Sequence, residues 1–537
     1  MRGSTLVRLL DERADRDGAA PALMTAEEVV SYRQLRDRAA SVAEGLVEAG
    51  IGPGDRVALW LPNCAEYVET CFALARLGAI AVALNTRFRA HEAQDILSRS
   101  GARALVLCPE VKNVDFLSMV AGLDRRALPA LDTLILVGSS ARPPEAPADL
   151  RTVPFDALRR AGTRRGAPAP AADLRVTGDS PCNVFTSSGT TSAPKLVLLD
   201  QAALATHARH VASAFGYGAP DCRVLCMLPL CGVFGFDTLL GTLAGGAAAV
   251  LMPVFDGDEA ARLIERHRVT HTNGADEMLR RILAASDPQR LGSLREAAFA
   301  NFSGDPRALV DAGDRLGAHF FQTYGSSEVQ ALMCYQAPGT GAERRALGGG
   351  VPVADEIEVR VRDPETDRLL GPGESGQLEI RGPNILAGYL GDERARRRTL
   401  TEDGFVRSGD LGYLEGGGKG FVYLARLGDA LRLGGFLVHP REIEEFLEGL
   451  PGVGGAQVVG VSLPTGTVPV GFVVGDGSAR LDEEDLIARC RTRLAAFKVP
   501  RRIVRLSAFP TVGSANGVKI RRVELRDRAA ELLREAP

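Results

Sequence analysis

Short apolar runs and longer amphipathic segments alternate along the N-terminal part of this chain. The short runs have the length and continuity of buried strands, and the longer segments have the spacing of helices. In chain order, we expect a strand at Val57–Leu61, a helix at Cys64–Leu77, a strand at Ala79–Leu84, a helix at His91–Ser98 and a strand at Ala104–Leu107. This alternation predicts parallel strands joined by crossover helices that pack on both faces of a sheet.

A second alternating series runs from Val224 to Thr323, with buried strands expected at Ala248–Met252 and Val269–Thr272. Between the two series, Ser139–Asp173 is rich in Pro, Ala and Arg and has no sustained periodicity. We expect this segment to be a surface excursion.

The pattern changes again in the last third of the chain. Two short strands, Ile357–Val361 and Gln377–Arg381, are separated by a cluster of turn residues and predict a β-rich subdomain. Beyond it, helices are expected at Arg441–Leu447 and Glu483–Leu494, and strands at Ala456–Val461 and Val468–Val474. The predicted fold is therefore α/β: a large N-terminal domain of mainly parallel sheets at residues 1–427, and a small mobile α+β domain at residues 428–537.

Composition and charge exclude several classes of protein. A net charge of −3 with interspersed signs gives no electrostatic case for a nucleic-acid partner. Asp11 and Glu12 interrupt the apolar N-terminus too early for a signal peptide. The longest apolar stretch, Leu239–Phe255, contains Gly245-Gly246, so we do not expect it to span a membrane. The nine scattered cysteines indicate reduced thiols, so we expect a cytoplasmic protein with no integral membrane association.

One loop has the composition of a phosphate-binding segment. Ser187-Ser188-Gly189-Thr190-Thr191-Ser192-Ala193-Pro194-Lys195 follows the strand-like stretch Asn183–Phe185. Its backbone N–H groups and hydroxyls can close around polyphosphate oxygens, while Lys195 supplies a point charge. Taken alone, such a run is as often a surface turn, so the remaining motifs have to decide between the two interpretations.

Four further motifs follow in a fixed order. They are Gln322-Thr323-Tyr324-Gly325-Ser326-Ser327-Glu328, then Ser408-Gly409-Asp410-Leu411-Gly412, then Arg426-Leu427-Gly428-Asp429, and last Ser514–Arg522 around Lys519. With the upstream loop, this set resembles the adenylate-forming superfamily of acyl- and aryl-CoA synthetases, luciferase and nonribosomal peptide synthetase adenylation domains, and most of all its CoA-ligase-like members. The resemblance covers nearly the whole chain.

The resemblance implies the chemistry of the site. The cofactors would be ATP, Mg²⁺ and CoA as acceptor, and a small-molecule acid would be the substrate. Thr190, Thr191 and Lys195 would hold the β- and γ-phosphates, with Thr190 counted as catalytic. Glu328 would ligate Mg²⁺. Lys519 would bridge the attacking carboxylate and the α-phosphate, because it is a compact charge on a long stem.

The resemblance also assigns the remaining residues. Tyr324 would lie against adenine, Asp410 would accept the ribose hydroxyls with help from Arg426, and Asp429 would be the hinge. The residues expected to bind the nucleotide are Ser188, Gly189, Thr190, Thr191, Lys195, Gly304, Asp305, Tyr324, Gly325, Ser327, Asp410 and Arg426. Those expected to line the acid pocket are Cys231, Gly232, Phe234, Asn301, Ser303, Gln322 and Gly325.

Several positions depart from the commonest family pattern. Ser192 and Leu196 replace glycines of the phosphate loop, and Gly428 replaces a lysine beside the hinge. Gly232 stands where many acyl-CoA synthetases carry a histidine next to the acyl group. These departures leave the acyl side of the reaction open.

Three functions are therefore in competition. The first is a ligase that forms an acyl- or aryl-adenylate from a carboxylic acid and ATP and passes it to CoA. The second keeps adenylation but changes the acceptor, either by loading a carrier protein or by activating nitrite for attack by an arylamine. The third, a non-catalytic nucleotide-binding protein, is disfavoured because Lys195, Glu328, Asp410 and Lys519 are all present. The pattern does not identify the acid or the oligomeric state.

Overall fold

The structure is a computed structural model of the chain. It describes all residues except 1–3, 113, 139–145, 165–175, 187–193, 303–304, 428–430, 434–435, 439, 464–465, 479–480, 515–516 and 536–537. It leaves out the side chains of residues 162–164, 432, 436–437, 512–514, 517–519 and 535 as well. The chain divides into a first unit, Met1–Glu358 with Ile380–Val406, and a second unit, Val359–Glu379 with Arg407–Pro537.

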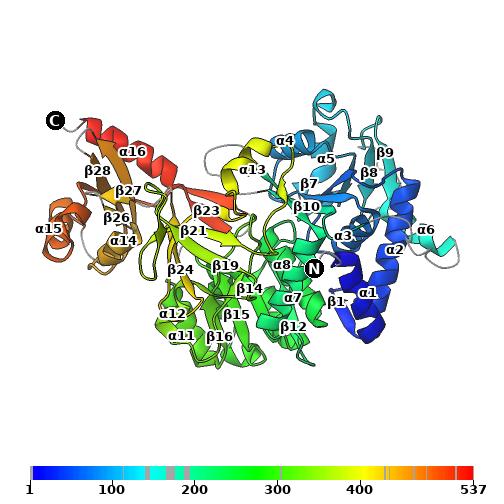
Figure 1. The fold of residues 1–537 in the computed structure, drawn as a ribbon, viewed down its shortest axis with the longest axis horizontal. Coiled ribbons are helices and arrows are strands. Elements are labelled where there is room, and N and C mark those ends of the chain that lie inside the picture. The colour runs from blue at the N-terminus through cyan, green and yellow to red at the C-terminus, as the bar shows by residue number, and fades with distance from the viewer. Residues whose placement is uncertain are drawn as a thin grey trace. The chain divides into compact units, whose positions relative to one another are not determined.

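The first unit contains two large sheets, most of whose strands Figure 1 shows in blue to green. Sheet A has the order β16 (His319–Gln322), β15 (Glu296–Ala300), β14 (His271–Ala275), β12 (Arg223–Cys226), β13 (Ala248–Leu251), β1 (Pro21–Met24) and β2 (Val29–Ser31). Its neighbouring strands pair in parallel from β16 through to β1, and only β2 runs antiparallel. A parallel sheet brings the carboxyl ends of its strands to one edge, where ligands usually bind.

Sheet B has the order β22 (Gly388–Tyr389), β11 (Leu196–Asp200), β10 (Pro181–Thr186), β4 (Ile80–Ala83), β3 (Arg56–Trp60), β5 (Ala104–Leu107), β8 (Thr133–Leu136) and β9 (Arg151–Pro154). The strands from β10 to β9 are parallel, whereas β11 pairs antiparallel with both β10 and β22. The short strand β22 therefore joins a segment near residue 389 to the strand that follows the phosphate loop.

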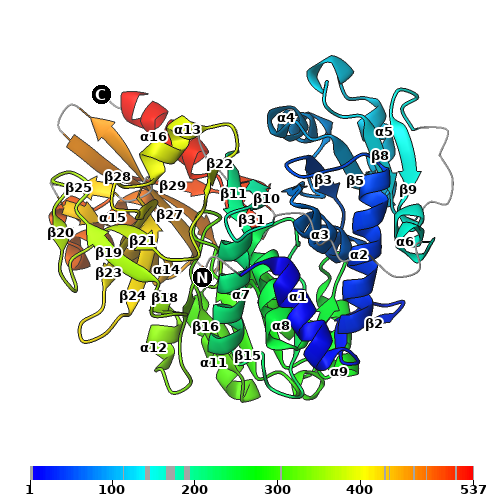
Figure 2. The ribbon, with the colours of Figure 1, turned by 45° about the vertical axis from the view of Figure 1, so that its right-hand side comes forward.

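Helices pack between and around these sheets. The helices of the first unit are α1 (Leu6–Asp17), α2 (Tyr32–Glu48), α3 (Ala65–Leu77), α4 (Ala90–Ser100), α5 (Phe116–Ala121), α6 (Phe155–Arg164), α7 (Gln201–Ala214), α8 (Val233–Gly245), α9 (Gly257–His267), α10 (Asp276–Ala284), α11 (Pro306–Leu316), α12 (Ala342–Arg345) and α13 (Glu393–Thr399). Helices α3 and α7 contact strands of sheet B, α8 contacts strands of sheet A, and α7 packs on α8. These helices thus form a layer shared by the two sheets (Figure 2).

The first unit also carries two short antiparallel strand pairs, β6 (Glu110–Val111) with β7 (Val114–Asp115) and β17 (Cys334–Tyr335) with β18 (Gly348–Pro352). The second unit begins with neighbouring strands in the order β24 (Phe421–Arg426), β23 (Val406–Leu414), β21 (Gly376–Arg381), β19 (Glu358–Arg362) and β20 (Leu369–Leu370). These strands form the β-rich part that the sequence predicts.

The rest of the second unit is a compact α+β module. It consists of β25 (Leu431–Leu433), β26 (Phe436–Val438), α14 (Pro440–Glu448), β27 (Val453–Leu463), β28 (Gly466–Gly475), α15 (Glu483–Arg493), β29 (Arg502–Leu506), β30 (Thr511–Ser514), β31 (Gly517–Ile520) and α16 (Arg522–Glu535). Alternate residues of the sheet β27-β28-β29 enter two separate apolar clusters: Val458 joins the one that holds residues of α14 and α15, and Val459 joins the one that holds residues of α16. Both faces of this sheet are therefore covered.

The structure confirms the predicted α/β class and most of the predicted elements. Two expectations were wrong in detail. The strand expected at Val269–Thr272 begins at His271, because α9 ends in a left-handed cap at Arg268 and the N–H of Val269 still bonds the carbonyl of Ile264. The expected surface excursion contains β9 and α6, since Phe155 and Leu158 are buried one turn apart. The predicted boundary between residues 427 and 428 stays a prediction.

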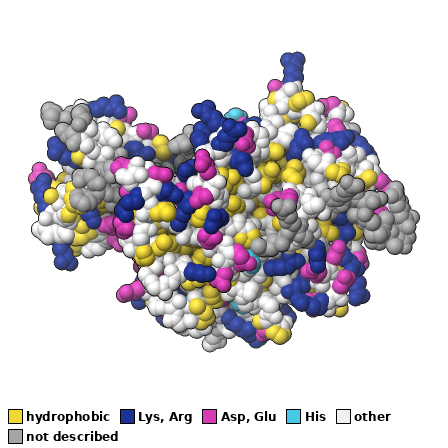
Figure 3. Space-filling model, viewed as in Figure 1, with side chains coloured by type: hydrophobic (Ala, Val, Ile, Leu, Met, Phe, Trp, Pro, Cys, Tyr) yellow, Lys and Arg dark blue, Asp and Glu magenta, His cyan; other side chains and the backbone are white. Residues whose placement is uncertain are grey.

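Among the described residues, no helix combines the length and the apolar character needed to cross a bilayer. On the face drawn in Figure 3, basic and acidic side chains are interspersed, which agrees with the charge pattern of the sequence.

Candidate active site

The phosphate loop lies between β10 and β11. Ser188, Gly189, Thr190 and Thr191 lie outside the described residues, and the description resumes at Pro194, whose carbonyl accepts a hydrogen bond of 2.8 Å from Arg99 on α4. Lys195 is half-buried at the start of β11, and its Nζ lies 4.9 Å from the ring centroid of Tyr389. This contact places the lysine beside strand β22.

The segment that follows β16 forms a tight loop, which we call the Glu328 loop (residues 324–334). Met333 N–H donates to the carbonyl of Tyr324 at 3.2 Å, and Ser326 and Gln330 form an antiparallel bridge. A Cβ on Gly325 would lie 2.5 Å from the carbonyl oxygen of Gln330. Only glycine therefore fits where the two arms of the loop cross.

Glu328 is held both through its carboxylate and through its backbone. Its Oε1 accepts a hydrogen bond of 3.1 Å from the hydroxyl of Tyr389, and its backbone carbonyl accepts the N–H of Leu386 at 2.8 Å. Burial and the nearby carboxylate of Glu328 raise the pKa of Tyr389, so its hydroxyl remains a donor at neutral pH. Tyr389 thus links the two residues expected to hold Mg²⁺ and phosphate, Glu328 and Lys195.

The predicted acid pocket surrounds the start of α8. Gly232 is the N-cap residue of that helix, and Cys231 and Phe234 are buried. Burial raises the pKa of the Cys231 thiol to about 12, so the thiol is neutral. Asn63 holds the preceding turn, because its amide donates to the carbonyl of Leu228 and accepts from Leu230 N–H. The turn is therefore fixed by a buried side chain from a distant part of the chain.

The other pocket residues follow neighbouring strands of sheet A. Asn301 comes directly after β15 and Gln322 ends β16. The amide of Gln322 donates to the carbonyl of Ala346, so this side chain has a structural bond. Asp305 caps α11, because its carboxylate accepts Arg307 N–H at 2.8 Å. Ser303 and Gly304 lie outside the described residues.

Asp410 and Arg426 meet in the second unit. They are direct partners across the antiparallel strands β23 and β24, and Nη1 of Arg426 lies 3.0 Å from Oδ1 of Asp410. The side chain of Asp410 is 3% exposed and that of Arg426 is 52% exposed. Ser408 adds its hydroxyl as acceptor for Asp410 N–H at 3.0 Å. A fixed carboxylate of this kind can accept two hydroxyl donors.

The last two predicted residues are only partly described. Lys519 belongs to β31, where its backbone pairs with Val512, but its side chain lies outside the described part. Asp429 lies wholly outside it.

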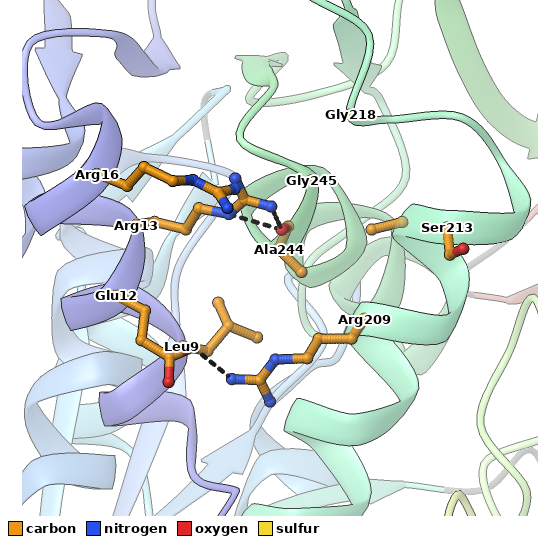
Figure 4. Close-up of a pocket in the computed structure, with 10 residues that line it drawn as sticks. Leu9, Glu12, Arg13, Arg16, Arg209, Ser213, Gly218, Ala244 and Gly245 are labelled. Carbon is orange, nitrogen blue, oxygen red and sulfur yellow. Dashed lines mark hydrogen bonds and ion pairs between the residues drawn. The ribbon is translucent and has the colours of Figure 1, made fainter.

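A cavity of about 350 Å³ opens elsewhere in the first unit, between α1, α7 and α8 (Figure 4). The guanidinium of Arg13 donates to the carbonyl of Ala244 in the last turn of α8, and Arg209 pairs with Glu12. Arg13 thus satisfies a carbonyl at the end of a helix. None of the predicted site residues lines this cavity, and we assign the chemistry to the motif residues.

Comparison with known proteins decides the family. A family model described as AMP-binding enzyme matches residues 10–390, and a second, described as AMP-binding enzyme C-terminal domain, matches residues 442–516. The chain belongs to the AMP-binding enzymes. The predicted superfamily and the prediction of an ATP-dependent adenylate-forming enzyme are thereby confirmed.

The relatives of this AMP-binding enzyme match nearly its whole length. A 3-[(3aS,4S,7aS)-7a-methyl-1,5-dioxo-octahydro-1H-inden-4-yl]propanoyl:CoA ligase from Mycobacterium tuberculosis is 32% identical and covers 94% of this chain and 95% of its own. A feruloyl-CoA synthase from an Amycolatopsis species is 32% identical, with 96% and 97% covered. O-succinylbenzoate Coenzyme A synthetase from Bacillus subtilis, solved with ATP and a magnesium ion, superposes with a TM-score of 0.75 at 26% identity, with 96% and 98% covered.

Two residues of the AMP-binding enzyme's site were missed by the sequence analysis. Tyr389 gives no signal of its own, because a tyrosine after a Gly in a short apolar run is usually a core residue. No local sequence pattern indicates a role for Asn63 either, since its hydrogen-bond partners lie 165 and 167 residues away along the chain. Both were found only because folding brings them to the motifs.

Proposed function

We propose that this AMP-binding enzyme is an ATP-dependent, AMP-forming acid:CoA ligase. A carboxylate attacks the α-phosphate of ATP and releases pyrophosphate, and the thiol of CoA then displaces AMP to give a thioester. The observation that carries the proposal is the arrangement of Glu328, Tyr389 and Lys195, in which a motif carboxylate and a motif lysine share one tyrosine. The names of the full-length relatives support CoA as the acceptor.

The donor set around Glu328 suits Mg²⁺. This ion usually keeps several waters and binds one or two carboxylates together with substrate phosphates. Among the described residues, no group of three or more His, Cys, Asp and Glu could form a dedicated metal cage. A single half-buried carboxylate is therefore the kind of ligand expected, with the remaining ligands supplied by ATP and water. The bound ion would neutralise charge on the phosphates.

The residues of the chain would contribute to catalysis by positioning the substrates and by stabilising the charge that develops on the phosphates. Lys195, with Thr190 and Thr191, would bind the β- and γ-phosphates, Tyr324 would pack on adenine, and Asp410 would accept the ribose hydroxyls. Lys519 would reach the attacking carboxylate and the α-phosphate, delivered by a hinge at Asp429.

We further propose that the acid carries a ring. The names of the M. tuberculosis and Amycolatopsis relatives specify acids with rings. The pocket candidates Cys231 and Phe234 are buried and apolar, and Gly232 offers no side chain beside them. A flat or compact ring gains from such contacts without requiring a charged partner.

Two finer expectations belong to the same proposal. The nine cysteines are all free, which supports a cytoplasmic location. Among acceptors, CoA is favoured over a carrier protein and over nitrite with an arylamine, because the three relatives described above are all CoA ligases or synthetases.

A two-part assay tests this function. Pyrophosphate release is measured with ring-bearing, fatty and amino acids and with nitrite, each with and without CoA or an arylamine. In Lys519→Ala, we expect adenylation to fall about 10²–10³-fold, whereas transfer from supplied acyl-adenylate to CoA continues. Turnover of nitrite with an arylamine, but of no acid with CoA, would replace this proposal.

A further inference from the structure

The Glu328 loop has an unfavourable backbone immediately after its carboxylate. Gln330 and Leu332 have φ values of +60° and +57°, in the left-handed region that side-chain-bearing residues rarely adopt. Ala331 lies between them. A loop with two such residues relaxes unless the surrounding structure over-determines it.

Two buried side chains hold the residue at the centre of this strained stretch. Nε2 of His207, on α7, lies 2.6 Å from the carbonyl oxygen of Ala331. The N–H of Ala331 donates to Oδ2 of Asp237, on α8, at 2.7 Å. His207 is 0% exposed and Asp237 is 1% exposed. Both backbone polar groups of one residue are thus bound by side chains from two different helices.

The two preceding residues are held by further hydrogen bonds. The amide of Gln330 donates to the carbonyl of Ala203 on α7 and to that of Asn384. The amide of Asn384 donates in turn to the carbonyl of Val329. All of these contacts lie within the first unit, and they hold the backbone of Val329 and Ala331 and the side chain of Gln330, in the stretch that directly follows Glu328.

We propose that His207 and Asp237 are positioning residues, which hold Ala331 between its two left-handed neighbours and thereby fix the direction of the Glu328 carboxylate. Neither side chain reaches the carboxylate itself; each acts through the backbone. The inference rests on the proposed role of Glu328 as the magnesium ligand. In this proposal, His207 and Asp237 keep Glu328 in place before Mg²⁺ binds.

The protonation states fit this role. Because a carbonyl oxygen only accepts, His207 must donate through Nε2–H, and burial lowers its pKa to about 4, so the ring is neutral at physiological pH. Burial raises the pKa of Asp237 well above its usual value. A neutral acid or an amide can accept Ala331 N–H equally well, so the contact needs an acceptor rather than a charge.

The test compares apolar with conservative variants. His207→Leu and Asp237→Leu remove the donor and the acceptor, whereas His207→Gln and Asp237→Asn keep them. In the apolar variants we expect the Mg²⁺ concentration for half-maximal pyrophosphate release to rise about tenfold, as for loss of other supporting residues around a metal, and the conservative variants to stay within about twofold of wild type. Tyr32→Phe, which removes a buried hydroxyl that donates to the carbonyls of Leu243 on α8 and of Ala247 just after it, is the matched control and should lower only the melting temperature.

Two further measurements separate positioning from loss of stability. Amide hydrogen exchange in the metal-free protein should accelerate at residues 329–332 in His207→Leu but not in Tyr32→Phe. In the same variant, Mg²⁺ should no longer increase the affinity for ATP that calorimetry measures. If His207→Leu does not fold, Asn384→Ala, which removes the contact to Val329, replaces it in both measurements.

The outcomes are distinct. If Glu328→Gln leaves the Mg²⁺ dependence unchanged, the proposed function of Glu328 fails. If Glu328→Gln is impaired but the apolar variants match Tyr32→Phe in Mg²⁺ dependence and in exchange, the positioning role is wrong. An increased Mg²⁺ requirement in His207→Leu that His207→Gln restores supports it.

Discussion

Two carboxylates of the candidate site, Glu328 and Asp410, are fixed by different means. Glu328 is half-buried on a strained loop, and buried groups of α7 and α8 hold the backbone that follows it. Asp410 is buried within the strand β23, and its partner Arg426 is the residue opposite in the register of β23 and β24. The first arrangement depends on residues from distant parts of the chain, and the second on local strand pairing. Substitutions around Glu328 and around Asp410 should therefore have different effects on activity and stability.

The largest expected effect is on Glu328 itself. In Glu328→Gln, the charge is lost while the shape is kept, and we expect pyrophosphate release to fall about 10²–10³-fold. The melting temperature should stay close to that of wild type, because the side chain is half-exposed. Mg²⁺-dependent kinetics and thermal melting measure both. A variant that melts much lower but retains normal turnover per folded molecule would make Glu328 structural.

Asp410→Ala comes next. Hydrogen bonds to a charged group are each worth about 1.5–3 kcal/mol, so losing the proposed ribose contact should raise KM for ATP about tenfold to hundredfold. Because Arg426 is 52% exposed, it can be solvated when its partner is removed. We therefore expect only a small loss of stability. Arg426→Gln is the matched control: a larger effect on KM than that of Asp410→Ala would reverse the assigned roles.

The pH dependence of stability should distinguish the surroundings of the Glu328 loop from those of Asp410. Burial lowers the pKa of His207 to about 4 from its usual 6.5. Between these two pH values the unfolded chain therefore binds a proton that the folded chain does not bind. The free energy of unfolding should fall as pH drops from 6.5 towards 4, by at most about 1.4 kcal/mol per pH unit. His207→Gln removes this group. Chemical unfolding at a series of pH values should give a flatter profile for the variant; parallel profiles would mean that His207 titrates normally.

The smallest effect is expected for Tyr389→Phe. The change removes the hydroxyl that donates to Oε1 of Glu328 and contacts Thr399, but the ring remains beside Lys195. A hydrogen bond to a charged group contributes about 1.5–3 kcal/mol, but Glu328 is only half-buried, so water can replace the hydroxyl and the Mg²⁺ requirement should rise only a few-fold. A titration of Mg²⁺ at saturating ATP measures it. A loss as large as that of Glu328→Gln would mean that Tyr389 itself takes part in the chemistry.

Much of the fold could be predicted from the pattern of the sequence. The strand expected at Val57–Leu61 is β3, and the helix expected at Cys64–Leu77 is α3, because strands buried on both faces of a parallel sheet are nearly continuous apolar runs that are easily recognised. The prediction was least successful at residues 151–164. There a short amphipathic helix of few residues carries too little periodic signal to stand out from a Pro- and Ala-rich background.

By itself, the sequence determined the family, the class of fold and the motif residues, since these depend on residue types in a fixed order along the chain. It also predicts that Asp410 and Arg426 act together, and the structure adds that they are direct partners across two strands. Only the tertiary structure decided what holds the Glu328 loop. His207, Asp237, Asn384 and Tyr389 belong to no motif, and their importance arises from burial beside a strained backbone. Long-range packing creates those hydrogen bonds, and no local pattern encodes them.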